Sequence, residues 1–311
     1  MRLIAAFFKL VRLPNLLFIA LTQVLFQYCI YLPIYGDNVP ENDTLRFVLI
    51  VFASLLIAAA GYIINDYFDI NIDEVNKPER VVVDKIISRR WAIAWHFMLS
   101  VTGIGLTIIA LPFFQFPHLV MANVFCVILL WFYSTNYKKT LAIGNIVISL
   151  LTAWTILIIF FSKFPLGYVY DNGVLMIDPK FFRLTFLYAA FAFIISLVRE
   201  AIKDMEDLPG DSRYGCKTMP VVWGMNSTRV YVTVWVIVLV AGLSILEIYV
   251  LPFRWWWPAL YNLVLVIVPL ALILYQLFKA KEPKDYGKIS TLTKAVMLTG
   301  TLSMIFFYFY L

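Results

Sequence analysis

The sequence predicts an all-α, polytopic membrane protein with nine transmembrane helices. Of its 311 residues, 62% are hydrophobic and only 14% are charged, a composition that excludes a soluble domain. Nine apolar runs are long enough to cross a bilayer as helices. Lysine and arginine gather in alternate connecting segments, which is typical of loops that remain in the cytoplasm.

The nine runs and the segment before them follow in chain order. The N-terminal segment, residues 1–14, mixes Arg2, Lys9 and Arg12 with large apolar residues and has no small-residue cleavage site. We therefore expect a short helix lying in the membrane interface, not a removable signal. The expected spans are residues 15–35, 45–65, 91–112, 118–135, 141–162, 182–202, 228–250, 259–278 and 290–310. We expect the whole chain, residues 1–311, to form a single transmembrane domain.

The orientation follows from the basic residues. With the N-terminus inside, 20 of the 25 lysines and arginines lie in inner segments or at inner span ends, and five lie outside. The net charge of +6 is therefore explained by loop bias, and no nucleic-acid partner is expected. The sequence predicts an integral protein of the inner or cell membrane, with its N-terminus in the cytoplasm.

The first acidic window follows the second apolar run. It begins Asn65-Asp66 and places carboxylates at Asp66, Asp69 and Asp73. The spacing i, i+3, i+7 brings three side chains to one face of a helix end. Three crowded acids repel one another, and a divalent cation among them relieves that repulsion.

A second window repeats this spacing after the sixth apolar run, with Asp204, Asp207 and Asp211. The two windows, residues 66–84 and 200–211, hold 11 of the 19 acidic residues. Oxygen ligands without histidine or cysteine favour a hard ion, and Mg²⁺ is the usual companion of phosphate groups. The alternative is that each window is only a solvated loop between helices. On the orientation above, both windows face the cytoplasm.

These motifs resemble those of the UbiA superfamily of intramembrane prenyltransferases. Its N-D-x-x-D-x-x-x-D motif after the second helix is matched by Asn65, Asp66, Asp69 and Asp73. Its second Asp-rich motif, after the sixth helix, is matched by Asp204, Asp207 and Asp211. The resemblance implies nine helices around a central lipid-accessible cavity with a cytoplasmic Asp-rich cap. It also implies Mg²⁺-dependent transfer of a polyprenyl group, geranylgeranyl being our expectation, from its diphosphate.

The resemblance also implies roles for individual residues. The expected Mg²⁺ ligands are Asn65, Asp69, Asp73, Asp207 and Asp211, while Asp66 and Asp204 ligate directly or orient the others. Tyr133 is one of several aromatic candidates to face a developing allylic cation. Asn15, in an Arg-x-x-Asn pattern, is expected in the cavity or, alternatively, as a helix cap. The basic residues expected to bind the diphosphate, or else only to enforce topology, are Lys77, Arg80, Lys138, Lys139, Lys203 and Lys217.

The acceptor stays open between two classes. The string from Lys203 to Asp211 is close to that of archaeal-type members that build glycerol-phosphate ether lipids, which favours a prenylglycerol phosphate acceptor. Related strings occur in members that prenylate aromatic rings in quinone synthesis. Either acceptor is lipid-soluble or amphipathic and reaches the site from the membrane lipid. A transporter whose acids line an ion path is the alternative from a different class.

One stretch departs from the family pattern. After Arg80, the residues Val81-Val82-Val83-Asp84-Lys85 replace the usual continuation. The sequence therefore leaves the shape of this loop open.

Overall fold

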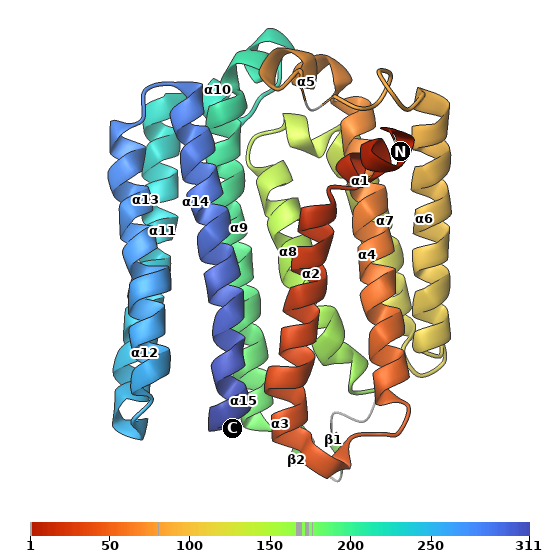
Figure 1. The fold of residues 1–311 in the computed structure, drawn as a ribbon, viewed down its shortest axis with the longest axis vertical. Helices are drawn as coiled ribbons and strands as arrows, with labels where there is room; N and C mark the ends of the chain where they lie inside the picture. The colour runs from red at the N-terminus through yellow and green to blue at the C-terminus, as the bar shows by residue number, and fades with distance from the viewer. Residues whose placement is uncertain (1, 80, 166–169, 172–173, 176) are drawn as a thin grey trace. The chain divides into compact units, whose positions relative to one another are not determined.

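The apolar runs fold into helices because, inside a bilayer, every backbone N–H and C=O must find its partner within the same segment. The computed structural model describes residues 2–79, 81–165, 170–171, 174–175 and 177–311. Within those residues, nine helices are long and apolar enough to cross a membrane (Figure 1). The expected all-α architecture with nine spans is confirmed, and the chain is an integral membrane protein.

The first five spans and their connections occupy residues 2–162. The first span is built from three pieces, because a π-helical turn at Phe26–Tyr31 separates α2 from α3. The helices are α1 (Arg2–Leu10), α2 (Leu13–Leu25), α3 (Leu32–Tyr35), α4 (Asp43–Phe68), α5 (Ile70–Asn76), α6 (Arg89–Ala110), α7 (Pro117–Thr135) and α8 (Ile143–Ser162), with short 3-10 turns at Gly36–Asn38 and Tyr137–Lys139.

The remaining four spans follow a small hairpin, in which β1 (Tyr170–Asp171) pairs antiparallel with β2 (Val174–Leu175). The eighth span, like the first, contains a π-helical turn, at Leu263–Ile267. The helices are α9 (Pro179–Arg213), α10 (Met219–Val222), α11 (Gly224–Val250), α12 (Trp256–Asn262), α13 (Val268–Lys279), α14 (Pro283–Leu302) and α15 (Phe307–Tyr310), with 3-10 turns at Leu251–Phe253 and Ser303–Phe306.

The chain forms two compact units. The first contains residues 1–138 and 154–186, and the second contains residues 139–153 and 187–311. The first acidic motif belongs to the first unit and the second motif to the second unit.

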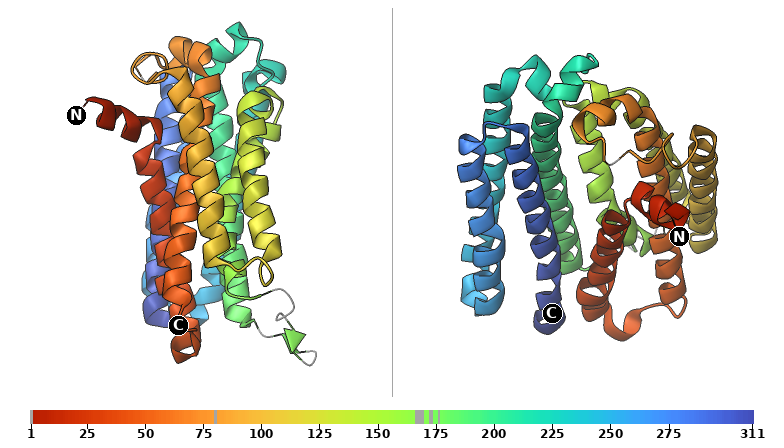
Figure 2. Two further views of the ribbon diagram at one scale, coloured as in Figure 1. Left: turned by 90° about the vertical axis from the view of Figure 1, so that its right-hand side faces the viewer. Right: turned by 45° about the horizontal axis from the view of Figure 1, so that its top comes forward.

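In the first unit, the expected interfacial helix is present as α1. Leu10 and Val11 are buried against Ala60 and Ile63 of α4, whereas Leu3 and Ile4 are exposed. In the left view of Figure 2, α1 turns sharply away from the direction of α2. An amphipathic helix at such an angle can lie along the membrane surface with one face on the protein.

The loop that departs from the family pattern packs into the same cluster. Val82 and Val83 are 2% and 1% exposed, against the residues that α1 and α4 contribute. Backbone hydrogen bonds from Ile86 to Val82 (2.9 Å) and from Asp84 to Ile87 (2.8 Å) close a tight turn. The apolar valines thus hold the loop after the first motif against the protein by burial.

In the second unit, α9 is the longest helix. It extends to Arg213, 11 residues beyond the predicted end at 202, and Pro209 lies inside it. Apolar side chains of α9, α11, α13 and α14 form one buried cluster, which includes Ile202, Met205 and Tyr286. Because Met205 is buried within the second motif, this cluster fixes the helix turns that carry the acids.

Candidate active site

The first acidic motif follows a nearly continuous helical path. Asp66 lies in the last turn of α4, Asp69 at the junction, and Asp73 in α5. The backbone N–H of Asp69 donates to the carbonyl of Asn65 (3.0 Å), and that of Asp73 donates to the carbonyl of Asp69 (2.8 Å). The helical spacing expected for the three acids is therefore retained across the junction.

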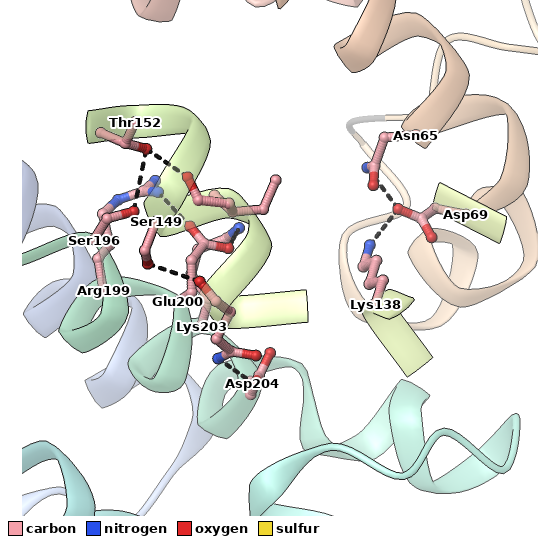
Figure 3. Close-up of polar contacts among 12 residues, drawn as sticks. Asn65, Asp69, Lys138, Ser149, Thr152, Ser196, Arg199, Glu200, Lys203 and Asp204 are labelled. Atoms are coloured by element: carbon pink, nitrogen blue, oxygen red, sulfur yellow. Dashed lines mark hydrogen bonds and ion pairs between the residues drawn. The ribbon is translucent and has the colours of Figure 1, made fainter. Parts of the chain in front are cut away.

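Asp69 lies at the centre of the first motif and is only 1% exposed. Its Oδ2 accepts hydrogen bonds from Nδ2 of Asn65 (2.6 Å) and from the ammonium group of Lys138 (Figure 3). Its second oxygen, Oδ1, and Oδ1 of Asn65 are both buried and have no hydrogen-bond partner among the described residues. Burying an oxygen without a hydrogen-bond partner costs free energy of folding, unless a ligand binds to that oxygen.

Arg12 reaches the same motif from the bend between α1 and α2. Its guanidinium donates to Oδ1 of Asp66 over 2.7 Å and lies 5.2 Å from the ring centre of Tyr62. Burial lowers the pKa of Arg12, but the nearby Asp66, Tyr62 and Asp73 raise it by more than burial lowers it. Arg12 therefore stays charged. The same balance holds at Lys138, where burial lowers the pKa and Asp69, Tyr133 and Asp73 together more than offset that effect.

The residues of the first motif fit a hard divalent cation. Burial, followed by repulsion from Asp69, raises the pKa of Asp73 to about 6, so its carboxylate gains from a nearby positive charge. Asn65 and Asp69 add the two buried oxygens, and carboxylate and amide oxygens are the ligands that Mg²⁺ takes. Within the residues that the structure describes, no group of three or more histidine, cysteine or acidic side chains is gathered closely enough to hold a metal ion.

In the second unit, the acids of the second motif lie on one continuous helix. Nδ2 of Asn145, in α8, donates to Oδ2 of Asp204 over 2.9 Å. Asp211 is 5% exposed, and its Oδ2 accepts a hydrogen bond from Oγ1 of Thr218 (3.1 Å). Asp207 is half-buried between them. Asp204 and Asp211 therefore each have a fixed side-chain partner.

A buried charge network lies on α9 one turn before the second motif. Glu200, 7% exposed, accepts hydrogen bonds from Arg199 (2.9 Å) and Lys203 (2.8 Å). Figure 3 shows Arg199 and Ser196 beside Thr152 of α8, whose hydroxyl lies 3.3 Å from that of Ser196. Lys203 therefore forms an ion pair inside its own helix.

The other expected residues differ in how far they are exposed. Tyr133 is half-buried and raises the pKa of Lys138 electrostatically. Asn15 and Lys77 are half-buried. Lys139 and Lys217 have exposed side chains, and their segments are joined by a backbone hydrogen bond of 2.9 Å from Lys217 to Lys139. The expectation for Arg80 lies outside the described residues.

Sequence reasoning did not assign a role to three residues that lie near the acids. Arg12 was noted only as the start of the Arg-x-x-Asn pattern. Asn145 is the polar residue at the start of an otherwise apolar span, which was a usable signal. Glu200 lies at i−4 from Asp204, where its pairing with two basic neighbours was not predictable from spacing alone.

Known proteins are similar to this chain over nearly its whole length. The digeranylgeranylglyceryl phosphate synthase of Saccharolobus solfataricus is 28% identical over 303 residues, 96% of this chain and 95% of the relative. A solved structure described as giving insights into digeranylgeranylglyceryl phosphate synthase in membranes is 25% identical, covers 100% of both chains and has a TM-score of 0.61. A UbiA homologue from Archaeoglobus fulgidus, solved with DMAPP and Mg²⁺, is 16% identical and covers 96% of this chain and 98% of its own, with a TM-score of 0.56.

The family comparison covers nearly all of the spans described above. Residues 16–307 match the model of the UbiA prenyltransferase family, a stretch that includes both acidic motifs. Motif residues, helix count and overall match thus agree, and the chain belongs to the UbiA prenyltransferase family.

Proposed function

We propose that this protein transfers a geranylgeranyl group from its diphosphate to the hydroxyl group of a prenylglycerol phosphate, with Mg²⁺ as cofactor. The bond between the allylic carbon and the diphosphate oxygen breaks, and the electron pair leaves with the diphosphate. The acceptor oxygen forms the new ether bond and releases its proton. Membership of a prenyltransferase family favours this reaction over ion transport.

The arrangement around Asp69 carries the proposal. Oδ1 of Asp69 and Oδ1 of Asn65 are buried without partners among the described atoms, and Lys138 is beside them. Such a site offers oxygens to a cation and an ammonium group to an anion. A complex of a metal ion with a diphosphate needs both the oxygen ligands and the ammonium group. In a purely structural salt bridge, the buried oxygens are expected to have hydrogen-bond partners.

We assign the binding of the metal ion and of the diphosphate to different residues of the chain. Mg²⁺, when bound, supplies the positive charge that stabilises the departing diphosphate. Asn65, Asp69 and Asp73 would hold it in the first unit, and Asp207 and Asp211 are the ligands that we propose for the second unit. Basic residues of both motifs, Lys77, Lys138 and Lys203 among them, would bind diphosphate oxygens. Tyr133 would shield the allylic carbon from water.

The acceptor assignment is supported by relatives. The Saccharolobus solfataricus protein is named for making digeranylgeranylglyceryl phosphate, and it aligns over 96% of this chain. Its name implies a phosphate-bearing acceptor, and an amphipathic acceptor of this kind suits a site where membrane helices end. An aromatic acceptor remains the competing outcome of the test below.

We further propose that residues 1–311 act as one domain around a lipid-accessible cavity. The family match crosses both compact units, which supports a shared activity. The excess of lysine and arginine on one side of the predicted spans supports a cytoplasmic N-terminus and cytoplasmic acidic motifs in the cell membrane.

The test uses purified full-length protein, labelled geranylgeranyl diphosphate and two acceptors, a geranylgeranylglycerol phosphate and an aromatic quinone precursor. We expect ether-lipid product only with Mg²⁺ and the glycerol phosphate. Asp69→Asn and Asp207→Asn should each lower diphosphate release by about 100-fold or more, whereas Asp84→Asn, an exposed acid paired with Arg89, should match wild type. Full activity in EDTA would refute the proposed dependence on Mg²⁺. Product formed from the aromatic acceptor alone would refute the proposed prenylglycerol phosphate acceptor.

A further inference from the structure

A pocket in the second unit is lined by none of the residues assigned above. It has a volume of about 250 Å³ and lies where the last turn of α13 faces the first turns of α14. Its lining residues are Gln276, Lys279, Ala280, Asp285, Lys288 and Ile289. Two of these six carry an ammonium group.

The hairpin around this pocket is strongly basic. Residues 279–294 contain five lysines, Lys279, Lys281, Lys284, Lys288 and Lys294, against two acids, Glu282 and Asp285. Lys279 is folded over its neighbour Tyr275, 4.2 Å from the ring centre and hydrogen-bonded to the phenol oxygen. In the described part of the chain, neither Lys279 nor Lys288 is in an ion pair.

The one acid in the pocket is already engaged. Oδ2 of Asp285 accepts hydrogen bonds from the backbone N–H groups of Lys281 (3.1 Å) and Glu282 (3.2 Å). These bonds belong to a capping box that closes the start of α14. Asp285 therefore caps the start of α14, and its carboxylate also attracts Lys288 electrostatically.

The floor of the pocket is fixed from behind. The guanidinium of Arg229, in α11, donates to the carbonyl of Ala280 (2.7 Å) and to the hydroxyl of Tyr286 (2.8 Å). Tyr286 is 1% exposed and belongs to the apolar cluster of the unit. The turn between the two lysines is thus held in place by Arg229, while both lysine side chains stay exposed at its surface.

Apolar side chains continue from the pocket along α13. Leu272, one turn before Gln276 on the pocket side of α13, is 46% exposed, and α13 is part of a candidate membrane span. Exposed apolar residues on such a helix face lipid tails. A ligand that fits here has an anionic head at the lysines and a hydrocarbon tail along α13.

We propose that the pocket between α13 and α14 binds the phosphate headgroup of an anionic membrane phospholipid. The shared chemistry is a phosphate oxygen meeting two ammonium groups, and the tail distinguishes a lipid from free phosphate. Basic pockets between membrane helices bind such headgroups. None of the lining residues belongs to the acidic motifs, and the proposal does not depend on the reaction proposed above.

The test measures retention of phosphatidylglycerol by the full-length protein, using native mass spectrometry after exchange into mixed phosphatidylglycerol and phosphatidylcholine vesicles. We expect the double variant Lys279→Gln/Lys288→Gln to lower retention by about tenfold or more. The matched variant Lys281→Gln/Lys284→Gln removes the same charge from the same hairpin but not from the pocket. It should change retention by less than about twofold.

Three outcomes decide the proposal. Equal loss in both double variants would show diffuse attraction to a basic surface and overturn it. Displacement of the lipid by millimolar inorganic phosphate would assign the site to free phosphate and overturn the lipid assignment. Recovery of retention in Lys279→Arg/Lys288→Arg, with wild-type thermal midpoints throughout, would support it.

Discussion

Arg12 donates to Oδ1 of Asp66 over 2.7 Å, although 54 residues separate them in the chain. Arg12 adopts a left-handed backbone conformation with φ of 52°, which ends α1 and turns the chain into the first span. One residue thus makes the bend and reaches the first acidic motif. The N-terminal helix is therefore tied to the site by an ion pair as well as by apolar packing.

Replacing Arg12 tests this link. Arg12→Ala leaves Asp66 without its cation, and a lost hydrogen bond between charged groups costs about 1.5–3 kcal/mol. We expect kcat/KM for the prenyl diphosphate to fall about 10- to 100-fold in Mg²⁺-dependent diphosphate release. Arg89→Ala is the control, because the Arg89–Asp84 pair is about half exposed and such pairs contribute little. Equal effects of the two variants would contradict a role for Arg12.

Asn145 is expected to position Asp204. Asn145→Ala removes the hydrogen bond of 2.9 Å and should weaken the apparent affinity for Mg²⁺ by about tenfold. The matched control is Asn123→Ala, since Asn123 is also buried but bonds Thr107 and Trp154 in the first unit. That variant should lower the thermal midpoint and leave the Mg²⁺ dependence unchanged. An unchanged Mg²⁺ titration in Asn145→Ala would remove the positioning role.

A buried ion pair predicts how stability depends on pH. Lys163 donates to both oxygens of Asp43 (2.7 and 3.0 Å), and its side chain is 2% exposed. Burial lowers the pKa of Lys163 to about 8, although Asp43 partly offsets it, and Arg46 lowers it further. Between about pH 8 and 10.5 the unfolded chain therefore binds more protons than the folded one, so stability rises with pH.

The expected gain across that window is about 3 kcal/mol. It should appear as a thermal midpoint in detergent that increases from pH 8 to 10.5 more steeply in wild type than in Lys163→Met. Lys180→Met, at an exposed lysine, serves as the control. If the midpoint of wild type and of Lys163→Met followed the same pH curve, Lys163 would not titrate as described.

Two glycines of α6 provide a matched pair for packing. A Cβ at Gly103 would lie 2.8 Å from Cγ1 of Ile57 and 3.2 Å from the carbonyl oxygen of Ala53, whereas a Cβ at Gly105 meets nothing within 4 Å. Gly103→Ala should therefore destabilise the protein by about 1–3 kcal/mol because α4 and α6 must separate. Gly105→Ala should be neutral or stabilising, as alanine favours the helix. Thermal midpoints of the two variants check this, and a stable Gly103→Ala would contradict the close approach.

The spans and both acidic motifs were predictable because each depends on local pattern. A run of some 20 apolar residues predicts a span whatever it packs against, and the i, i+3, i+7 spacing survives even at Asp69, between two helices. The end of α9 was predicted 11 residues early because apolarity stops near Ile202. The helix itself continues because residues beyond Ile202, such as Met205, are buried in the apolar cluster of the second unit and stabilise its last turns.

The partners of the acids were harder to predict. Lys138 and Arg12 are 69 and 54 residues from the acids they contact, and nothing in residue spacing specifies pairing over such lengths. Val82 and Val83 differ from the family pattern, and only packing against α1 and α4 shows that they are buried. Residues on one face of a helix recur with a regular spacing in the sequence, whereas residues that meet over long distances in the chain do not, so such pairs could not be predicted.

The two cations at the first motif have a consequence for biogenesis. Lys138 and Arg12 balance two of its three carboxylates with charges that belong to the chain itself. A nascent protein can therefore insert these helices and reach its native shape before it meets an ion or a substrate. Synthesis in magnesium-poor cells should then yield correctly assembled protein that gains activity as soon as the ion is supplied.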